Sequence, residues 1–176
     1  MKHIYFTGMM GSGKSTIGEL FAKKMQIPFI DLDITIEQKN KSSVSQIFSS
    51  YGETAFRDME TQELQEISGI SHKCVIATGG GIIEREENRL LMRKTGVVIY
   101  LQVEVSTLVQ RLINIQNRPL LQELSPEKRY QKLQDVFEKR KRYYESCDIV
   151  IVSEKTVEAT ILKIEQELQK NEYNKN

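Results

Sequence analysis

The feature that most constrains how this chain can fold is a glycine-rich segment near its amino terminus. Gly8, Gly13, Lys14 and Ser15 match the pattern G-x-x-x-x-G-K-[ST], between a short apolar run and a segment whose apolar residues recur at helical spacing. Glycines let backbone N–H groups turn inward around phosphate oxygens, and the start of a helix adds a favourable dipole. A chance glycine-rich turn is the alternative, but the full spacing and the strand-to-helix context argue against it. The segment therefore predicts a phosphate-binding loop, or P-loop.

The residues of this loop predict contacts with a nucleotide that carries Mg²⁺, most simply ATP. The phosphates are expected to contact Gly11, Ser12, Gly13, Lys14, Ser15 and Thr16. Lys14 would reach the β- and γ-phosphates and stabilise the transferring group, so it is a candidate catalytic residue. Ser15 would supply a hydroxyl ligand to the metal. Asp31 ends the second predicted strand and is the candidate for supporting the metal, with a simple turn residue as the alternative.

Short apolar runs alternate with segments of helical periodicity along the chain. Strands are predicted at residues 2–7, 28–31, 74–77, 97–101 and 149–152, with helices between them and after the last strand. This alternation is typical of right-handed crossovers between parallel strands. We therefore expect an α/β fold with three layers, α/β/α, around a five-stranded parallel sheet, of the P-loop NTPase class and similar to nucleoside-monophosphate kinases. Ligands of such sheets bind at the carboxyl ends of the strands.

Local signals predict where some helices begin and end. Ser43 and Gln46 form a capping-box pattern that opens a helix. Gly52 is expected to break this helix before a second one at about 53–67, and the last helix is predicted at 156–168.

Length and charge limit the domain organisation and the partners. The 176 residues suit one kinase domain at 1–170, with an acceptor-binding region at about 33–60, a lid at about 114–124 and a polar tail at 171–176. A net charge of +1 offers no basic surface for nucleic acid. No apolar run approaches the roughly eighteen residues that indicate a membrane span. We expect a cytoplasmic monomer that binds small molecules.

Two segments carry candidates for binding and activating the acceptor of the phosphoryl group. Asp33 can accept or orient the proton of an acceptor hydroxyl. Capping of a helix ahead of Ile34 is the alternative, and it would not exclude this role. Arg57 and Glu60 are three residues apart on one predicted helix, so the carboxylate can orient the guanidinium. A surface ion pair is the alternative for these two residues.

Arg140 is a further candidate because it lies on the apolar side of its own helix. Leu133, Val136, Phe137 and Tyr144 share that side at helical spacing. A buried arginine requires an anion. The carboxylate of an acceptor would satisfy it by a bidentate contact, and an ion pair with an Asp or Glu elsewhere in the chain is the alternative.

Several short motifs follow one another in a fixed order. They are Gly8-Met-Met-Gly-Ser-Gly-Lys-Ser-Thr-Ile-Gly18, Asp31-Leu-Asp33, Ile47-Phe48, Gly52-Glu53, Phe56-Arg57-x-x-Glu60, Thr78-Gly-Gly-Gly81 and Arg118-Pro-Leu-Leu121. Each motif other than the P-loop is weak by itself, but this order and spacing resemble the shikimate kinase family. The similarity runs from about residue 4 to residue 152.

The resemblance implies transfer of the γ-phosphoryl group of ATP to the 3-hydroxyl of shikimate, a step in chorismate and aromatic amino-acid biosynthesis. The shikimate-binding residues that it implies are Asp33, Arg57, Gly79, Gly80, Gly81 and Arg140. Asp33 would hold the shikimate hydroxyls and act as base or orienter. The two arginines would bind the carboxylate, and Gly80 would offer a backbone N–H.

The resemblance also implies nucleotide and pocket contacts. Arg118 would reach the phosphates from the lid as a third catalytic residue, and Arg111 would stack on adenine. Asp31 would support Mg²⁺. The acceptor pocket would be lined by Phe48, Phe56, Pro119 and Leu120.

One departure from the family is local. The family often has Arg-x-Pro-Leu-Tyr where this chain has Arg140-Lys-Arg142-Tyr-Tyr144. The Arg-to-Tyr spacing still assigns Arg140, but Arg142 becomes a competing carboxylate ligand.

Other functions are compatible with a P-loop. One is a kinase for gluconate or a nucleoside monophosphate, although two inward arginines favour a carboxylated acceptor. Another is a nucleotide-binding module without catalysis, which the presence of Lys14 and Asp33 disfavours. A GTPase is disfavoured because the chain has no Asn-Lys-x-Asp segment, since Asn40-Lys41 is followed by Ser42 and Ser43.

Overall fold

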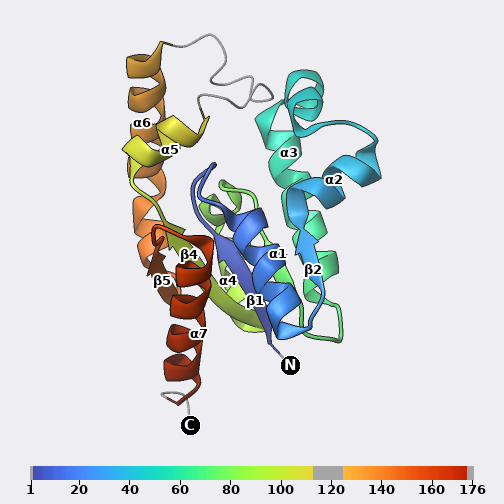
Figure 1. Ribbon diagram of the computed structural model, residues 1–176. Helices are drawn as coiled ribbons and strands as arrows, with labels where there is room; N and C mark the ends of the chain where they lie inside the picture. The colour runs from blue at the N-terminus through green and yellow to red at the C-terminus, as the bar shows by residue number, and fades with distance from the viewer. Residues whose placement is uncertain (1, 113–124, 174–176) are drawn as a thin grey trace.

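The computed structural model describes residues 2–112 and 125–173, which form a parallel sheet between two layers of helices (Figure 1). The strands are β1 (His3–Thr7), β2 (Phe29–Asp31), β3 (Val75–Ala77), β4 (Gly96–Gln102) and β5 (Ile149–Val152). The helices are α1 (Lys14–Met25), α2 (Leu32–Asn40), α3 (Val44–Ser68), α4 (Glu86–Thr95), α5 (Val105–Leu112), α6 (Pro126–Glu145) and α7 (Val157–Tyr173), with a short 3₁₀ helix, η1 (Ile82–Glu84). The five predicted strands are confirmed.

The sheet has the order β2-β3-β1-β4-β5, and every neighbouring pair is parallel. Successive side chains of a strand point to opposite faces. Ile4 and Phe6 of β1 therefore pack with α1 and α7, whereas Tyr5 packs in the cluster formed with α3, α4 and α6. Because both faces are covered, β1 is buried along its whole length. The predicted three-layer α/β/α fold is confirmed.

Three features of the helices refine the sequence prediction. Helix α2 was considered only as the alternative in which Asp33 caps a helix, and it begins directly after β2 because the Asp31 carboxylate caps its first backbone N–H groups. In α3 the predicted Ser43–Gln46 capping box forms, and Gly52 interrupts the helical backbone with φ 81° and ψ 172°. Helix α7 runs to Tyr173, past its predicted end at residue 168.

The chain path places the candidate site at the carboxyl ends of the strands. Figure 1 shows the end of β1 directed toward a region with α2 and α3 on one side and α5 and α6 on the other. The P-loop, the start of α2 and the glycines that follow β3 all lie at strand ends. None of the helices within 2–112 and 125–173 is long and apolar enough to cross a membrane.

Candidate active site

The P-loop connects β1 to α1 along a backbone path that requires glycine. Gly8, Gly11 and Gly13 have φ angles of 148°, 78° and 91°, which other residues rarely adopt. At Gly8 an added Cβ would also lie 2.7 Å from the carbonyl oxygen of Leu101 in β4. Gly13 immediately precedes α1, whose first backbone N–H groups have no partner inside the helix and suit an anion. The loop therefore has the conformation that phosphate binding needs.

Two cationic side chains contact the backbone of this loop. The Lys14 ammonium donates hydrogen bonds to the carbonyl oxygens of Gly8 at 2.9 Å and Met9 at 3.0 Å. Arg111, near the end of α5, donates from Nη1 to the carbonyl oxygen of Gly11 at 3.2 Å. The structure thus brings Arg111 to the P-loop, as its predicted nucleotide contact requires.

Ser15 and Asp31 connect the P-loop to the start of α2. Ser15 Oγ donates to Asp31 Oδ2 at 2.5 Å, while Asp31 Oδ1 accepts from the backbone N–H groups of Asp33 at 3.1 Å and Ile34 at 3.2 Å. One carboxylate oxygen therefore caps the helix and the other reaches the P-loop. The predicted alternative, that Asp33 is the helix cap, is wrong, because Asp31 occupies the capping position.

The Ser15–Asp31 pair fits Mg²⁺. Hydroxyl and carboxylate oxygens are ligands of the kind that Mg²⁺ prefers, and this ion commonly uses one or two protein oxygens together with phosphate and water. The described residues contain no group of three or more His, Cys, Asp and Glu side chains that could hold a metal by themselves. A metal at this position would therefore depend on the phosphates of the nucleotide.

The glycines after β3 lie against the acceptor side of the site. A Cβ added at Gly79 would collide with Glu60 Oε1 and lie 2.9 Å from Asp33 Oδ1, and one added at Gly81 would collide with the Arg57 guanidinium. Asp33, Arg57 and Glu60 are thus close together although they come from α2 and α3. Any larger residue at Gly79 or Gly81 would displace these side chains.

Gly80, the middle glycine of the segment 79–81, faces the P-loop and α6. A Cβ added there would lie 3.1 Å from the carbonyl oxygen of Gly8 and 3.6 Å from Arg140 Nη1. The Tyr144 hydroxyl donates to the carbonyl oxygen of Gly80 at 2.6 Å, and the Tyr144 ring stacks on Tyr100 with centroids 4.7 Å apart. Tyr144 therefore fixes the orientation of this peptide from α6.

Arg57 is held by two carboxylates beside two aromatic rings. Its Nη1 donates to Glu60 Oε2 at 2.5 Å and its Nη2 to Glu53 Oε1 at 2.9 Å. The guanidinium carbon lies 6.0 Å from the centre of the Phe48 ring and 5.6 Å from that of Phe56. The predicted Arg57–Glu60 pair therefore forms, and it is not a surface pair, because the Glu60 side chain is 0% exposed.

Burial controls the protonation of Glu60. Removal from water raises the pKa of Glu60 to about 7, against the opposing attraction of Arg57, and the nearby charge of Asp33 raises it further. The carboxyl group thus titrates near neutral pH, although it contacts a guanidinium.

We expect Glu60 to make the fold less stable as the pH rises. Its pKa is about 7 in the folded protein against an ordinary value of 4.5. Its stabilising contribution is therefore complete below the pKa of the unfolded chain and is lost as the pH rises through the pKa of the folded protein, a full change of about 3 kcal/mol. Chemical denaturation at about pH 5 and about pH 8 measures it. The free energy of unfolding should fall more for the wild type than for Glu60→Gln, and parallel changes in the two proteins would contradict this assignment.

Arg140 is buried on the inner side of α6, as its spacing predicted. It is 8% exposed, and its Nε and Nη2 contact Glu84 Oε1 at 2.8 Å and 2.6 Å. The predicted alternative of an ion pair within the chain is therefore present. Nη1 remains directed toward Gly80.

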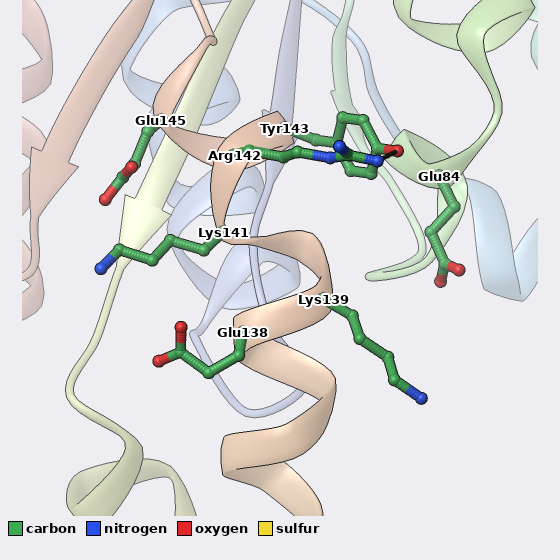
Figure 2. A pocket seen from close by; sticks show the side chains of 7 residues that line it. All are labelled: Glu84, Glu138, Lys139, Lys141, Arg142, Tyr143 and Glu145. Atoms are coloured by element: carbon green, nitrogen blue, oxygen red, sulfur yellow. Dashed lines mark hydrogen bonds between the residues drawn. The ribbon is translucent and has the colours of Figure 1, made fainter.

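Arg142 lies elsewhere, on the exposed side of the helix. The Arg142 side chain lies beside the Tyr143 ring (Figure 2). Its Nη2 donates to the Tyr143 hydroxyl at 2.6 Å, and its guanidinium carbon lies 4.6 Å from the centre of that ring. The contact with the glycine segment is therefore made by Arg140 and not by Arg142.

A hollow of about 660 Å³ lies over η1 and the outer side of α6 and shares only Glu84, the partner of Arg140, with the contacts described above (Figure 2). It is lined by Glu84, Glu138, Lys139, Lys141, Arg142, Tyr143 and Glu145. The lining is of mixed charge and mostly exposed, and it includes no residue of the P-loop. Chemistry on a nucleotide therefore belongs to the strand ends and not to this hollow.

Some predicted residues lie outside the described part of the chain, and other contacting residues were not predicted. Arg118, Pro119, Leu120 and the lid at 114–124 fall outside 2–112 and 125–173. The contacts of Glu53, Glu84 and Tyr144 were missed. The position of Glu53, four residues before Arg57, could have revealed its pairing, since residues four apart are neighbours on a helix. Glu84 is 56 residues from Arg140, and no local pattern connects them.

Comparison with known proteins agrees with this geometry. A protein-family model described as shikimate kinase matches residues 10–169. The chain belongs to the shikimate kinase family. Shikimate kinase of Sulfurihydrogenibium sp. (strain YO3AOP1) is 37% identical over 163 residues, which cover 93% of this chain and 95% of that protein. The family resemblance predicted from the motifs is confirmed.

Solved structures place this shikimate kinase family member among the P-loop kinases. Shikimate kinase from Acinetobacter baumannii in complex with shikimate superposes with a TM-score of 0.90 and 35% identity, covering 97% of this chain and 94% of that one. Deoxyadenosine kinase from M. mycoides has a TM-score of 0.56 at 18% identity and shares the fold alone. The chain is accordingly an ATP-dependent kinase, and the prediction of an enzyme is confirmed.

Proposed function

We propose that this chain transfers the γ-phosphoryl group of ATP to the 3-hydroxyl of shikimate, giving shikimate 3-phosphate and ADP for aromatic amino-acid biosynthesis. The observation that carries the proposal is that the P-loop and the glycine segment 79–81 lie next to each other at one edge of the sheet. The P-loop, with Lys14, suits a polyphosphate, and the adjacent glycine segment contacts Asp33, Arg57 and Arg140. A carboxylated polyol fits this combination of cations and an acidic group.

The reaction assigns a role to each of these side chains. The 3-hydroxyl oxygen forms a bond to the γ-phosphorus while the bond to the bridging oxygen breaks, and ADP leaves with that oxygen. Asp33 accepts or orients the hydroxyl proton, and Lys14 stabilises the negative charge of the transferring group. Arg57 and Arg140 bind the carboxylate of shikimate and set its orientation toward the nucleotide.

Nucleotide binding uses the other side of the site. Gly11 to Thr16 present backbone N–H groups to the phosphates, and Arg111 is proposed to contact the adenine. Mg²⁺ would be held by Ser15 and Asp31 and, when bound, neutralises charge on the phosphates. A phosphate contact from Arg118, a cytoplasmic location and a monomeric state stay predictions from the sequence.

A coupled assay of ADP release tests the function directly. Turnover is expected to require ATP, Mg²⁺ and shikimate together, and not to occur with gluconate or a nucleoside monophosphate in place of shikimate. The carboxamide of shikimate should bind more weakly, because it cannot form a charged pair with the arginines. Absence of shikimate turnover by a folded preparation would refute the proposal.

The Arg140→Ala variant is expected to bind shikimate about ten- to a hundredfold more weakly, because a hydrogen bond to a charged group contributes roughly 1.5 to 3 kcal/mol. Nucleotide affinity should change little. Steady-state KM values for both substrates, supported by calorimetry, measure the two effects. Arg142→Ala is the matched control on the same helix, since Arg142 is exposed and contacts Tyr143. Equal weakening of both substrates, or an equal effect in the control, would contradict the assignment.

A further inference from the structure

One edge of the Arg140 guanidinium is occupied within the protein. A guanidinium can bind a carboxylate through its Nε/Nη2 edge or through the edge formed by its two terminal nitrogens. Glu84 Oε1 accepts from Nε at 2.8 Å and contacts Nη2 at 2.6 Å, so it takes the first edge. Nη1 lies beside Gly80, where the proposed acceptor binds. The second edge is therefore the one that faces the substrate.

The backbone that carries Glu84 is itself anchored. Arg89 of α4 donates from Nη1 to the carbonyl oxygens of Ile83 at 2.6 Å and Glu84 at 3.0 Å, and Asn88 Nδ2 donates to that of Ile82 at 3.2 Å. The Arg89 guanidinium also lies 4.3 Å from the centre of the Tyr143 ring of α6. Although the Glu84 side chain is 44% exposed, it thus extends from a fixed 3₁₀ turn that is tied to α4 and α6.

We propose that Glu84 is a positioning residue that holds Arg140 in the orientation needed to bind the carboxylate of the acceptor. This inference rests on the proposed function. Ordering a long side chain on binding costs free energy, and a partner that orders it beforehand removes that cost. Glu84 would therefore increase the affinity for a carboxylated acceptor without contacting it.

The negative charge of Glu84 has the opposite effect on an anionic acceptor. If charge dominated, Glu84 would compete with the substrate and weaken its binding. The partial exposure of the Glu84 side chain screens this repulsion, whereas the orientation of Arg140, whose side chain is 10% exposed, is a short-range effect that solvent does not weaken. Positioning is therefore the larger effect.

Two substitutions of Glu84 separate these effects. Both contacts with Arg140 use the single oxygen Oε1, so the carbonyl oxygen of Gln can replace it. Glu84→Ala should raise the KM for shikimate about three- to tenfold, with kcat at saturating shikimate and the KM for ATP unchanged. Glu84→Gln should restore the KM to the wild-type value or slightly below it, because it keeps the contact and removes the charge.

Glu87→Ala is the matched control. Glu87 is 62% exposed on the next helix, 3.7 Å from Arg85, so its removal deletes a nearby charge without touching Arg140. Its kinetics should equal those of the wild type.

A KM for shikimate that is lowered in both Glu84 variants would show competition and overturn the proposal. An unchanged KM in Glu84→Ala would also overturn it. Thermal melting checks the fold, and Glu84→Ser serves as a second variant without the contact. Failure of wild-type turnover would instead count against the proposed function.

Discussion

The Asp33→Asn variant is expected to lower kcat with shikimate by about 10²- to 10⁴-fold, the usual contribution of a positioned general base. Asn has the same shape and can still hydrogen-bond to hydroxyl groups, but it cannot take up a proton at neutral pH. The KM for shikimate should therefore change much less than kcat. Single-turnover measurement of shikimate 3-phosphate formation gives the rate of the chemical step.

Loss of the helix cap cannot explain such a result. The cap of α2 is the Asp31 side chain, which accepts from the backbone N–H of residue 33, and this bond persists when residue 33 is Asn. Asp135→Asn, an exposed position on α6, is a control for a lost charge and should leave kcat unchanged. A kcat for Asp33→Asn close to that of the wild type would mean that the proton leaves by another route.

Removal of the Lys14 ammonium should lower kcat by about 10²- to 10³-fold, the effect of deleting one group that stabilises transition-state charge. In Lys14→Ala the γ-phosphoryl group loses its nearest cation of the P-loop, so the loss should fall on the chemical step more than on shikimate binding. The KM for shikimate should stay close to that of the wild type. Rapid-quench measurement with saturating ATP distinguishes the rate of transfer from nucleotide binding.

The fold should survive this change. Lys14 contributes two hydrogen bonds to carbonyl oxygens of its own loop, and Gly8, Gly11 and Gly13 keep the backbone path without it. Lys23→Ala, an exposed lysine of the same helix, is the control and should retain full activity and thermal stability. Unchanged transfer in Lys14→Ala would count against the whole mechanism.

Local sequence patterns were enough to predict the fold class and most of the secondary structure of the protein. The P-loop, the five strands and the break at Gly52 depend on residue types and spacings within a few positions, so they are visible along the chain. The start of α2 was missed because its cap, Asp31, was interpreted as the end of a strand and a metal-supporting residue. One oxygen of the Asp31 carboxylate caps α2 and the other accepts from Ser15 of the P-loop. A sequence pattern does not reveal that one residue makes both contacts.

The sequence by itself determined that this chain is a P-loop kinase of the shikimate kinase family, because motif order and apolar periodicity are properties of the linear chain. Only the tertiary structure decided which carboxylate meets Arg140, and that Glu60 is buried with a pKa near 7. It also showed why a side chain at residue 79 or 81 would collide with Glu60 or Arg57. The physical reason is that helical spacing relates residues three or four apart, whereas Arg140 and Glu84 meet through the packing of α6 on η1 across 56 residues.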